Sequence, residues 1–329
     1  MGVSAPAART GVVADIGGTN ARFAWVDLDS GSLEPRNPRD FRCRDFPTVQ
    51  AAIEAYLQGA GLGRPERCVL AVAGPVNGGT ITLTNAEWTV SAAELRRDGF
   101  GAARLINDFE ALALVAGRLT PEDAPAVGGP EQGLSHGTLA ILGAGTGLGV
   151  SALGREGGRE VPLATEGGHV AFAPADETEI EVLRILARRF GRVSLERLLS
   201  GPGLANLHQA LAEIDGVSPD GSDPEAITAG ALAGDPRKLR TVERFCSILG
   251  SAAGDFALAF GARGGVFIAG GIAPRILDLL QRSDFRSRFE AKGRFEAYLR
   301  AIPTRVIVRP HAALVGAAAA LQAMAAEPG

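Results

Sequence analysis

The chain has 329 residues, of which 46% are hydrophobic and 21% are charged. This is typical of a globular protein and excludes a largely disordered or fibrous chain. At about 150 residues per domain, the length predicts two domains. The net charge is −4 and there is no block of basic residues, which argues against nucleic-acid binding and leaves local geometry to hold any anionic ligand.

Glycine and cysteine usage set two further limits. The 44 glycines are about twice the number expected from an average usage of ~7%, which indicates special backbone positions. The three cysteines, Cys43, Cys68 and Cys246, are far apart and form no CxxC pair, so neither disulfides nor a structural zinc site is expected. With no apolar signal segment at the N-terminus, a cytoplasmic location is expected.

The first predicted element is a hairpin. A buried strand at 12–16 breaks at a glycine turn and resumes at 21–27. Backbone N–H groups on such a turn can approach phosphate oxygens closely, and a carboxylate at the strand end can hold Mg²⁺ against those phosphates. The alternative is an ordinary hairpin turn. The residues concerned are Asp15, Gly17, Gly18, Thr19 and Asn20.

A helix over 47–59 and a buried strand at 68–74 follow, and then a short strand at 103–106 that runs into Asn107, Asp108 and a further helix. Both Asn and Asp are good helix N-caps, so this pair could be purely structural. The functional alternative is that Asp108 accepts the proton of a substrate hydroxyl during phosphoryl transfer, while Asn107 hydrogen-bonds another hydroxyl. A helix N-terminus would favour the ionised carboxylate.

A second strand, glycine turn and strand occupy 139–153. Two such hairpins in a chain of this length suggest a duplicated fold, with two unrelated hairpins as the alternative. The turn GAGTGLG at 143–149 could cradle phosphates through Gly145, Thr146 and Gly147. It matches neither GxGxxG nor GxxxxGK[ST], and the two lysines of the chain lie elsewhere. Dinucleotide-binding, P-loop and protein-kinase designs are therefore excluded.

The segment EGGH places Glu166 and His169 on either side of a flexible turn. Zinc binding is not favoured, because there is no HExxH and no cysteine partner. Donor and acceptor groups of this kind suit a polyol with several hydroxyls to satisfy. The spacing around Glu196 is by itself more typical of a solvated helix residue than of a ligand.

The remaining elements are mostly helical. Asp176 and Glu179 stand at capping-box spacing before a helix, and a long buried helix at 241–261 leads to a strand at 265–270. The next turn contains the glycine pair 270–271, where an adenine or ribose could lie against the backbone; a tight strand-to-helix turn is the alternative.

Three further segments are interpreted from their composition. The alanine-rich segment 312–326 is short of the ~20 strongly apolar residues that a membrane span needs, so it predicts a packed C-terminal helix. Two stretches rich in proline and glycine, 120–137 and 215–225, are the expected linkers.

Six motifs of the chain, taken together, resemble those of a known family. In order and spacing they are similar to motifs of the bacterial ATP-dependent glucokinases of the hexokinase, actin and Hsp70 ATPase superfamily. The motifs are DIGGTNAR, LINDFEALAL, LGAGTGLG, EGGHVAF, ERLLSGPGL and IAGGI. The combination resembles the glucokinase branch rather than the ROK sugar kinases, whose cysteine-rich zinc motif has no counterpart here.

The resemblance implies an α/β protein with a two-domain, actin-like ATPase (ribonuclease H-like) fold, a duplicated core and an interdomain cleft. The smaller domain would span 1–118 and be completed by a C-terminal helix at about 306–329, and the larger domain would span 119–305. The implied activity is transfer of the γ-phosphoryl group of ATP to the 6-hydroxyl of D-glucose. We also expect a homodimer.

The resemblance also assigns roles to residues. Asp108 matches the catalytic base. The sugar ligands would be Asn107, Glu166, His169 and Glu196, which reverses the local interpretation of Glu196. The segments 15–20 and 143–149 match the two phosphate loops and 270–271 the adenosine turn, with Mg²⁺ near Asp15.

Other functions remain open at this stage. A related kinase could act on mannose, fructose or an amino sugar with the same residues. A non-catalytic actin-like ATPase would have no use for a polyol pocket, and a sugar-responsive regulator would usually add a basic helix-turn-helix segment, which the sequence lacks.

Overall fold

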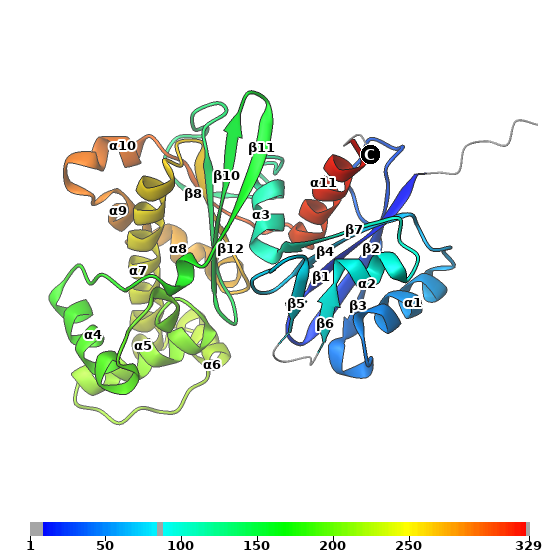
Figure 1. The fold of residues 1–329 in the computed structure, drawn as a ribbon. Helices are drawn as coiled ribbons and strands as arrows, with labels where there is room; N and C mark the ends of the chain where they lie inside the picture. Colours follow the sequence, from blue (N-terminus) through cyan, green and yellow to red (C-terminus); the bar gives the residue numbers. More distant parts are fainter. Residues whose placement is uncertain (1–8, 84–87, 327–329) are drawn as a thin grey trace, which may run out of the picture. The chain divides into compact units, whose positions relative to one another are not determined.

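The computed structural model describes residues 9–83 and 88–326. Within them the chain divides into two compact units, each with its own sheet and hydrophobic core (Figure 1). Unit 1 comprises Met1–Arg118 and Pro310–Gly329, and unit 2 comprises Leu119–Arg309. The last residues of the expected C-terminal segment, 327–329, lie outside the described residues.

Unit 1 is built on a five-stranded sheet with the order β3-β2-β1-β4-β7. The predicted hairpin is confirmed: β1 (Thr10–Ile16) and β2 (Asn20–Asp27) pair antiparallel. β4 (Arg67–Val72) and β7 (Ala102–Asn107) run parallel to β1. The carboxyl ends of β1, β4 and β7 therefore lie at one edge of the sheet, where ligands commonly bind in α/β proteins.

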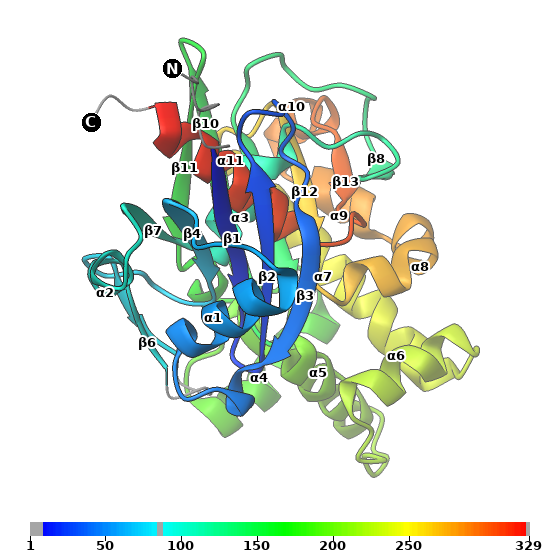
Figure 2. The same ribbon diagram turned by 90° about the vertical axis from the view of Figure 1, so that its right-hand side faces the viewer.

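Helices cover both faces of this sheet (Figure 2). α1 (Val49–Ala60) packs on one face, and α3 (Asp108–Ala116) and α11 (Ala312–Ala326) lie side by side on the other. The predicted C-terminal helix is thus confirmed. A Cβ on Gly316 would lie 1.8 Å from the backbone oxygen of Ala111, so glycine at this position allows the close approach of α11 to α3.

Unit 1 has several further elements. They are the edge strand β3 (Arg36–Arg42), the 3₁₀ turn Cys43–Asp45, the two-stranded sheet of β5 (Thr80–Thr82) and β6 (Thr89–Ser91), and α2 (Ala92–Arg97).

The first five strands of the sheet of unit 2 repeat the strand order of unit 1, and β8 adds a sixth. The full order is β11-β10-β9-β12-β13-β8. β9 (Leu139–Ala144) and β10 (Leu148–Glu156) form the second predicted hairpin, β11 (Arg159–Thr165) extends it antiparallel, and β12 (Gly265–Ala269) and β13 (Thr304–Val306) continue parallel to β9. Because both hairpins occupy equivalent places in sheets of the same order, the duplicated core is confirmed over two unrelated hairpins.

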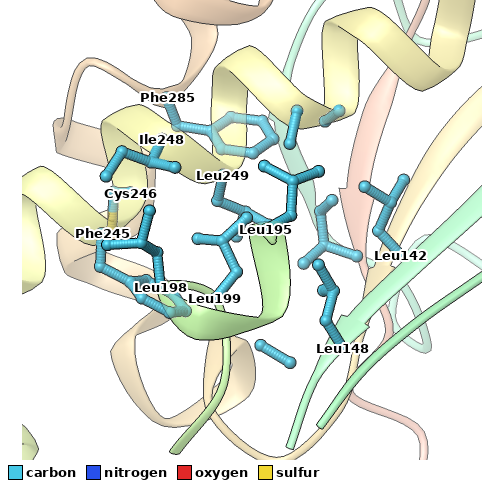
Figure 3. Close-up of a cluster of buried hydrophobic side chains, with 14 of the residues drawn as sticks. Leu142, Leu148, Leu195, Leu198, Leu199, Phe245, Cys246, Ile248, Leu249 and Phe285 are labelled. Atoms are coloured by element: carbon cyan, nitrogen blue, oxygen red, sulfur yellow. The ribbon is translucent and has the colours of Figure 1, made fainter. Parts of the chain in front are cut away.

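The core of unit 2 lies against the long helix α7 (Pro236–Phe260), which contains the predicted buried helix. Phe245 and Leu249 of α7 contribute to a cluster that also contains Leu148 of β10 and Leu195 (Figure 3). Side chains at such closely packed positions hold their backbone in place. The backbone around residues 148 and 195 is therefore held in place by the buried side chains of Leu148 and Leu195.

The helix α4 (Glu177–Phe190) shows how a predicted cap was partly right. Asp176 caps it as expected, accepting a hydrogen bond from Glu179 N at 2.9 Å, and Gly191 follows its last residue. The Glu179 carboxylate does not complete the box at Asp176, since it accepts from Ala175 N instead, at 2.8 Å. Tertiary contacts of Glu179 inside the unit decide this orientation.

The remaining elements of unit 2 are mostly helices. They are β8 (Ala126–Gly128), the 3₁₀ turns Gly167–His169, Leu195–Arg197, Ala273–Ile276 and Gly293–Phe295, α5 (Gly201–Ile214), α6 (Pro224–Leu232), α8 (Leu277–Arg282), α9 (Phe285–Glu290) and α10 (Glu296–Arg300). Neither expected linker joins the two units as a free connection. The stretch 120–137 contributes β8 to the sheet, and 215–225 runs from α5 to the first turn of α6 inside unit 2.

Two further features concern the described part of the chain as a whole. No helix there is long and apolar enough to cross a membrane. Cys43, Cys68 and Cys246 are buried free thiols, and burial raises the pKa of Cys68 and of Cys246 to about 12. Such thiols are poor nucleophiles at neutral pH.

Candidate active site

In unit 1, the turn between β1 and β2 carries the first predicted site segment. Gly17 N donates to Asn20 O at 2.9 Å and closes the turn, and Thr19 and Asn20 are exposed. A Cβ on Gly17 would meet only the carbonyl oxygen of Asn20, at 3.7 Å. The fold therefore tolerates a side chain at Gly17, and a requirement for glycine there would come from a ligand.

Asp15 lies at the end of β1, directly before this turn. Burial raises the pKa of its carboxyl group, and the guanidinium of Arg22 on β2, 3.4 Å from Asp15 Oδ2, opposes that shift. Arg22 also pairs with Asp40 of β3, its Nε 2.6 Å from Asp40 Oδ1. Asp15 is thus a single carboxylate held at the sheet edge and incompletely compensated by its own neighbours.

Asn107 and Asp108 lie at the carboxyl end of β7, on the same sheet edge. Asn107 is the N-cap of α3, as the structural interpretation predicts: its Oδ1 accepts from Phe109 N at 2.8 Å, and Glu110 Oε2 accepts from Asn107 N at 3.3 Å. Its Nδ2 donates to Gly74 O at 3.0 Å, just beyond β4. The capping role and a ligand role are compatible, because these bonds lock the amide in one orientation.

Asp108 is the first residue of α3 and is partly buried. Its Oδ1 accepts from Phe109 N at 3.0 Å, so the carboxylate is oriented by the helix N-terminus. Partial positive charge at a helix N-terminus stabilises the ionised carboxylate. An ionised, oriented carboxylate at a sheet edge has the properties of a proton acceptor.

In unit 2, the structure brings two of the predicted glycine turns together. The turn of the second hairpin is closed by Gly145 N donating to Gly147 O at 2.9 Å, and Thr146 at its tip is exposed. Ile272 N, directly after the third glycine turn, donates to Ala144 O at 3.4 Å. The segments 143–149 and 270–271 therefore adjoin at the carboxyl ends of the neighbouring parallel strands β9 and β12.

The glycines of these turns serve different purposes. Gly270 has φ +86°, and a Cβ there would lie 2.3 Å from Ala144 O, so the fold itself requires glycine. Added Cβ atoms on Gly145 or Gly271 would meet nothing within 4 Å. These two positions leave open space beside the backbone, as a ligand that approaches the main chain would need.

One contributor to this region was missed by sequence reasoning. The first residue of α5, Gly201, donates its N–H to Gly145 O at 2.7 Å and so fixes the turn from its other side. Ser200 caps the helix, accepting from Gly203 N at 3.0 Å, and a proline follows in the first turn. Serine followed by proline is a recognisable helix start, but only the fold brings it to the glycine turn.

Glu166, His169 and Glu196 also come together in unit 2. His169 Nε2 lies 4.0 Å from Glu166 Oε2, and His169 Nδ1 lies 3.9 Å from Glu196 Oε1. A backbone hydrogen bond from Leu195 N to Val170 O, at 2.9 Å, joins the two segments that carry them. The imidazole thus stands between two carboxylates, all three with solvent-accessible side chains.

The two glycines of EGGH explain how Glu166 and His169 reach this position. Gly167 and Gly168 are buried against β10. A Cβ on Gly167 would lie 2.8 Å from the Cβ of Val150, and one on Gly168 would lie 1.9 Å from Leu148 O. The flanking polar residues are therefore held outward by a backbone that packs directly on the sheet.

This packing makes a prediction. Gly168→Ala is expected to lower the free energy of unfolding by about 1–3 kcal/mol, the usual cost of overpacking, because the obstructing atom is a backbone oxygen that cannot rotate away. Urea denaturation followed by circular dichroism measures the change. Gly63→Ala is the matched control, since a Cβ there meets nothing within 4 Å. Equal free energies of unfolding for the two variants would contradict the conclusion that Gly168 packs directly against the backbone of β10.

Comparison with known proteins gives the family. The glucokinase family model matches residues 12–324. The chain is 57% identical over 312 residues to a glucokinase from Caulobacter sp. (strain K31), covering 94% of each chain. It is 47% identical over 328 residues to a glucokinase from Xanthomonas euvesicatoria pv. vesicatoria, covering 97% of each.

A solved structure agrees with these matches over the whole fold. The crystal structure of a glucokinase from an Antarctic psychrotroph is 36% identical, with a TM-score of 0.87 over 96% of this chain and 99% of that one. Its fold and the duplicated strand order described above confirm the expected actin-like ATPase class. The chain therefore belongs to the glucokinase family.

Proposed function

We propose that this protein transfers the γ-phosphoryl group of ATP to the 6-hydroxyl of D-glucose, giving glucose 6-phosphate and ADP. Membership in the glucokinase family supports the reaction. The observation that carries the assignment is the cluster of Glu166, His169 and Glu196 beside a glycine turn with open backbone. Such a cluster offers several hydrogen-bonding groups to a polyol next to a place for phosphates.

Asp108 is proposed as the general base. Its carboxylate would accept the proton of the 6-hydroxyl as that oxygen attacks the γ-phosphorus, which raises the nucleophilicity of the oxygen at the moment of transfer. Asn107, held in one orientation by its bonds to Gly74 and Phe109, would bind a neighbouring hydroxyl. Glu166, His169 and Glu196 would bind the remaining hydroxyls and fix the sugar in position.

The nucleotide would be held by backbone rather than by lysine. The segments 15–20 and 143–149 would bind the phosphates, and 270–271 would lie against adenosine. Open space at Gly145 and Gly271 supports this placement. The chain has only two lysines, Lys238 and Lys292, and neither lies in the segments 15–20, 143–149 or 270–271. A lysine within the loop is therefore not available as in a P-loop, and the backbone N–H groups of these turns can serve as donors to the phosphates.

Mg²⁺ would be held by Asp15 together with the phosphates. In the described residues no three acidic, histidine or cysteine side chains form a metal-binding group, so a cage made of protein ligands alone does not fit. A single carboxylate does fit the way Mg²⁺ binds nucleotides, keeping waters and sharing substrate phosphates. The raised pKa of Asp15 agrees with a carboxylate that lacks a full counter-charge. The ion would supply neutralisation of phosphate charge.

The wider proposals concern organisation. We infer that the two units act as domains that close on a bound sugar, because excluding water is what lets a kinase favour a sugar hydroxyl as acceptor. The boundary expected at 305/306 moves to 309/310, since β13 belongs to the sheet of unit 2. We also propose that the protein is a homodimer, which light scattering of the purified chain would test. A cytoplasmic location is proposed as well, because the three free cysteines suit a reducing compartment.

A kinase assay tests the reaction. The enzyme is offered glucose, mannose, fructose and glucosamine, with ATP, ADP or polyphosphate as donor, and product is measured directly. We expect the highest kcat/KM with glucose and ATP, and loss of activity when EDTA removes Mg²⁺. Preference for another hexose would correct the substrate, activity in EDTA would contradict the metal role, and no phosphorylation of any hexose would refute the proposal.

A further inference from the structure

Glu196 contacts two parts of the proposed site, namely His169, with which it forms the sugar cluster (Glu166, His169 and Glu196), and the phosphate turn at 143–149. One oxygen, Oε1, lies 3.9 Å from His169 Nδ1, and the other, Oε2, accepts a hydrogen bond from Leu148 N at 3.0 Å. The side chain is 32% exposed, so it is neither fully buried nor a freely solvated surface residue. A carboxylate that accepts from a backbone N–H forms one of the stronger kinds of hydrogen bond.

The carboxylate also occupies the space beside the turn. A Cβ on Gly147 would lie 2.5 Å from Glu196 Oε2 and 3.5 Å from its Cδ, and no other atom within 4 Å is nearby. Because residue 147 has no side chain, the Glu196 carboxylate can occupy the space beside the turn. By contrast, a Cβ on Gly145 in the same turn would meet nothing.

The backbone on both sides of this contact is fixed. Leu148 and Leu195 are buried in one hydrophobic cluster (Figure 3), and they adjoin the turn and Glu196 respectively. Neither segment can shift to relieve a change in the other without disturbing the core. What remains adjustable is the Glu196 side chain itself, between its two partners.

We propose that Glu196 is a positioning residue that couples the sugar site to the phosphate turn within unit 2, one carboxylate oxygen serving each. This rests on the proposed function. The two oxygens of a carboxylate form a rigid group, so rotation that brings Oε1 to a sugar hydroxyl also sets Oε2 against Leu148 N. Binding of sugar and the geometry of the turn then favour each other, and the coupling is reciprocal.

If Glu196 couples the two sites, a substitution in the phosphate turn should weaken glucose binding even when no nucleotide is present. Gly147→Ala is expected to raise the glucose Kd about tenfold, because displacement of Glu196 costs roughly one charged hydrogen bond. Isothermal titration of glucose into the full-length protein without nucleotide measures this. Neither Gly147 nor Gly145 has a positive φ, so alanine fits the backbone at both positions.

Gly145→Ala is the matched control. It adds the same methyl group to the same turn and, whatever it does to nucleotide binding, is expected to leave the glucose Kd without nucleotide within twofold of wild type. A glucose Kd that is unchanged in Gly147→Ala, or raised equally in both variants, overturns the proposal. If the wild-type protein itself binds no glucose, the proposed function fails instead, so the two failures are distinguishable.

A second measurement tests the same contact from the side of Glu196. Glu196→Asp shortens the side chain and withdraws the carboxylate from the turn, so Gly147→Ala should cost little more glucose affinity in that background. We expect clear non-additivity in this double-mutant cycle. Additive effects on glucose Kd, with all variants folded by circular dichroism, would show that the two positions act independently and would overturn the coupling.

Discussion

Asp108→Asn is expected to lower kcat for glucose phosphorylation by roughly 10²–10⁴, the range for loss of a general base. The amide keeps an oxygen that can accept from Phe109 N, the bond that Asp108 Oδ1 makes at 3.0 Å, so the start of α3 should be preserved. An amide cannot take the proton from the 6-hydroxyl. Steady-state kinetics with saturating glucose and ATP give the change, and the Kd for ATP should hardly move.

A control at an equivalent helix position separates chemistry from helix electrostatics. Glu177 is exposed and is the first residue of α4, as Asp108 is of α3. Glu177→Gln removes the same charge from a helix N-terminus and should leave kcat near the wild-type value. If Asp108→Asn also retains near-normal kcat, the base has been misassigned and the proton leaves by another group.

The second large effect is on stability and arises at Glu179. Its side chain is fully buried, and its Oε1 accepts from Arg244 Nη1 at 3.1 Å and from Arg288 Nη2 at 2.6 Å. Glu179→Gln would leave two partly buried guanidinium groups, with Asp176 as the remaining carboxylate that pairs with both among the described residues. Breaking a buried charge pair costs about 3–5 kcal/mol, and urea denaturation should show a loss of that size in the free energy of unfolding.

The surface of the same unit offers a matched control. Glu213 likewise bridges two arginines, Arg188 at 2.7 Å and Arg189 at 2.9 Å, but its side chain is exposed. Glu213→Gln should change the free energy of unfolding far less, because solvent already screens these charges. Similar losses in the two variants would mean that burial adds nothing to the Glu179 pairings, contrary to the physical argument.

The local fold could be predicted from sequence wherever neighbouring residues decide it. Glycine between two apolar runs specified both hairpins, and Asp176 before an apolar helix specified a cap. The alanine-rich C-terminus was correctly predicted as a packed helix. These features depend on backbone geometry and periodicity over a few residues. The stretch 215–225 was predicted as a linker and lies within unit 2. Proline and glycine indicate a loop, but they do not indicate whether the loop joins two units or lies within one.

The sequence by itself determined which chemical groups are present, and the order of its motifs determined the family. Only the tertiary structure decided which groups meet. Glu196 looked like a solvated residue by spacing and proved to contact Leu148, 48 positions away, and Gly201 proved to hold the turn at Gly145. The physical reason is that hydrogen bonds between distant segments depend on how helices and sheet pack together, which no local pattern of residues records.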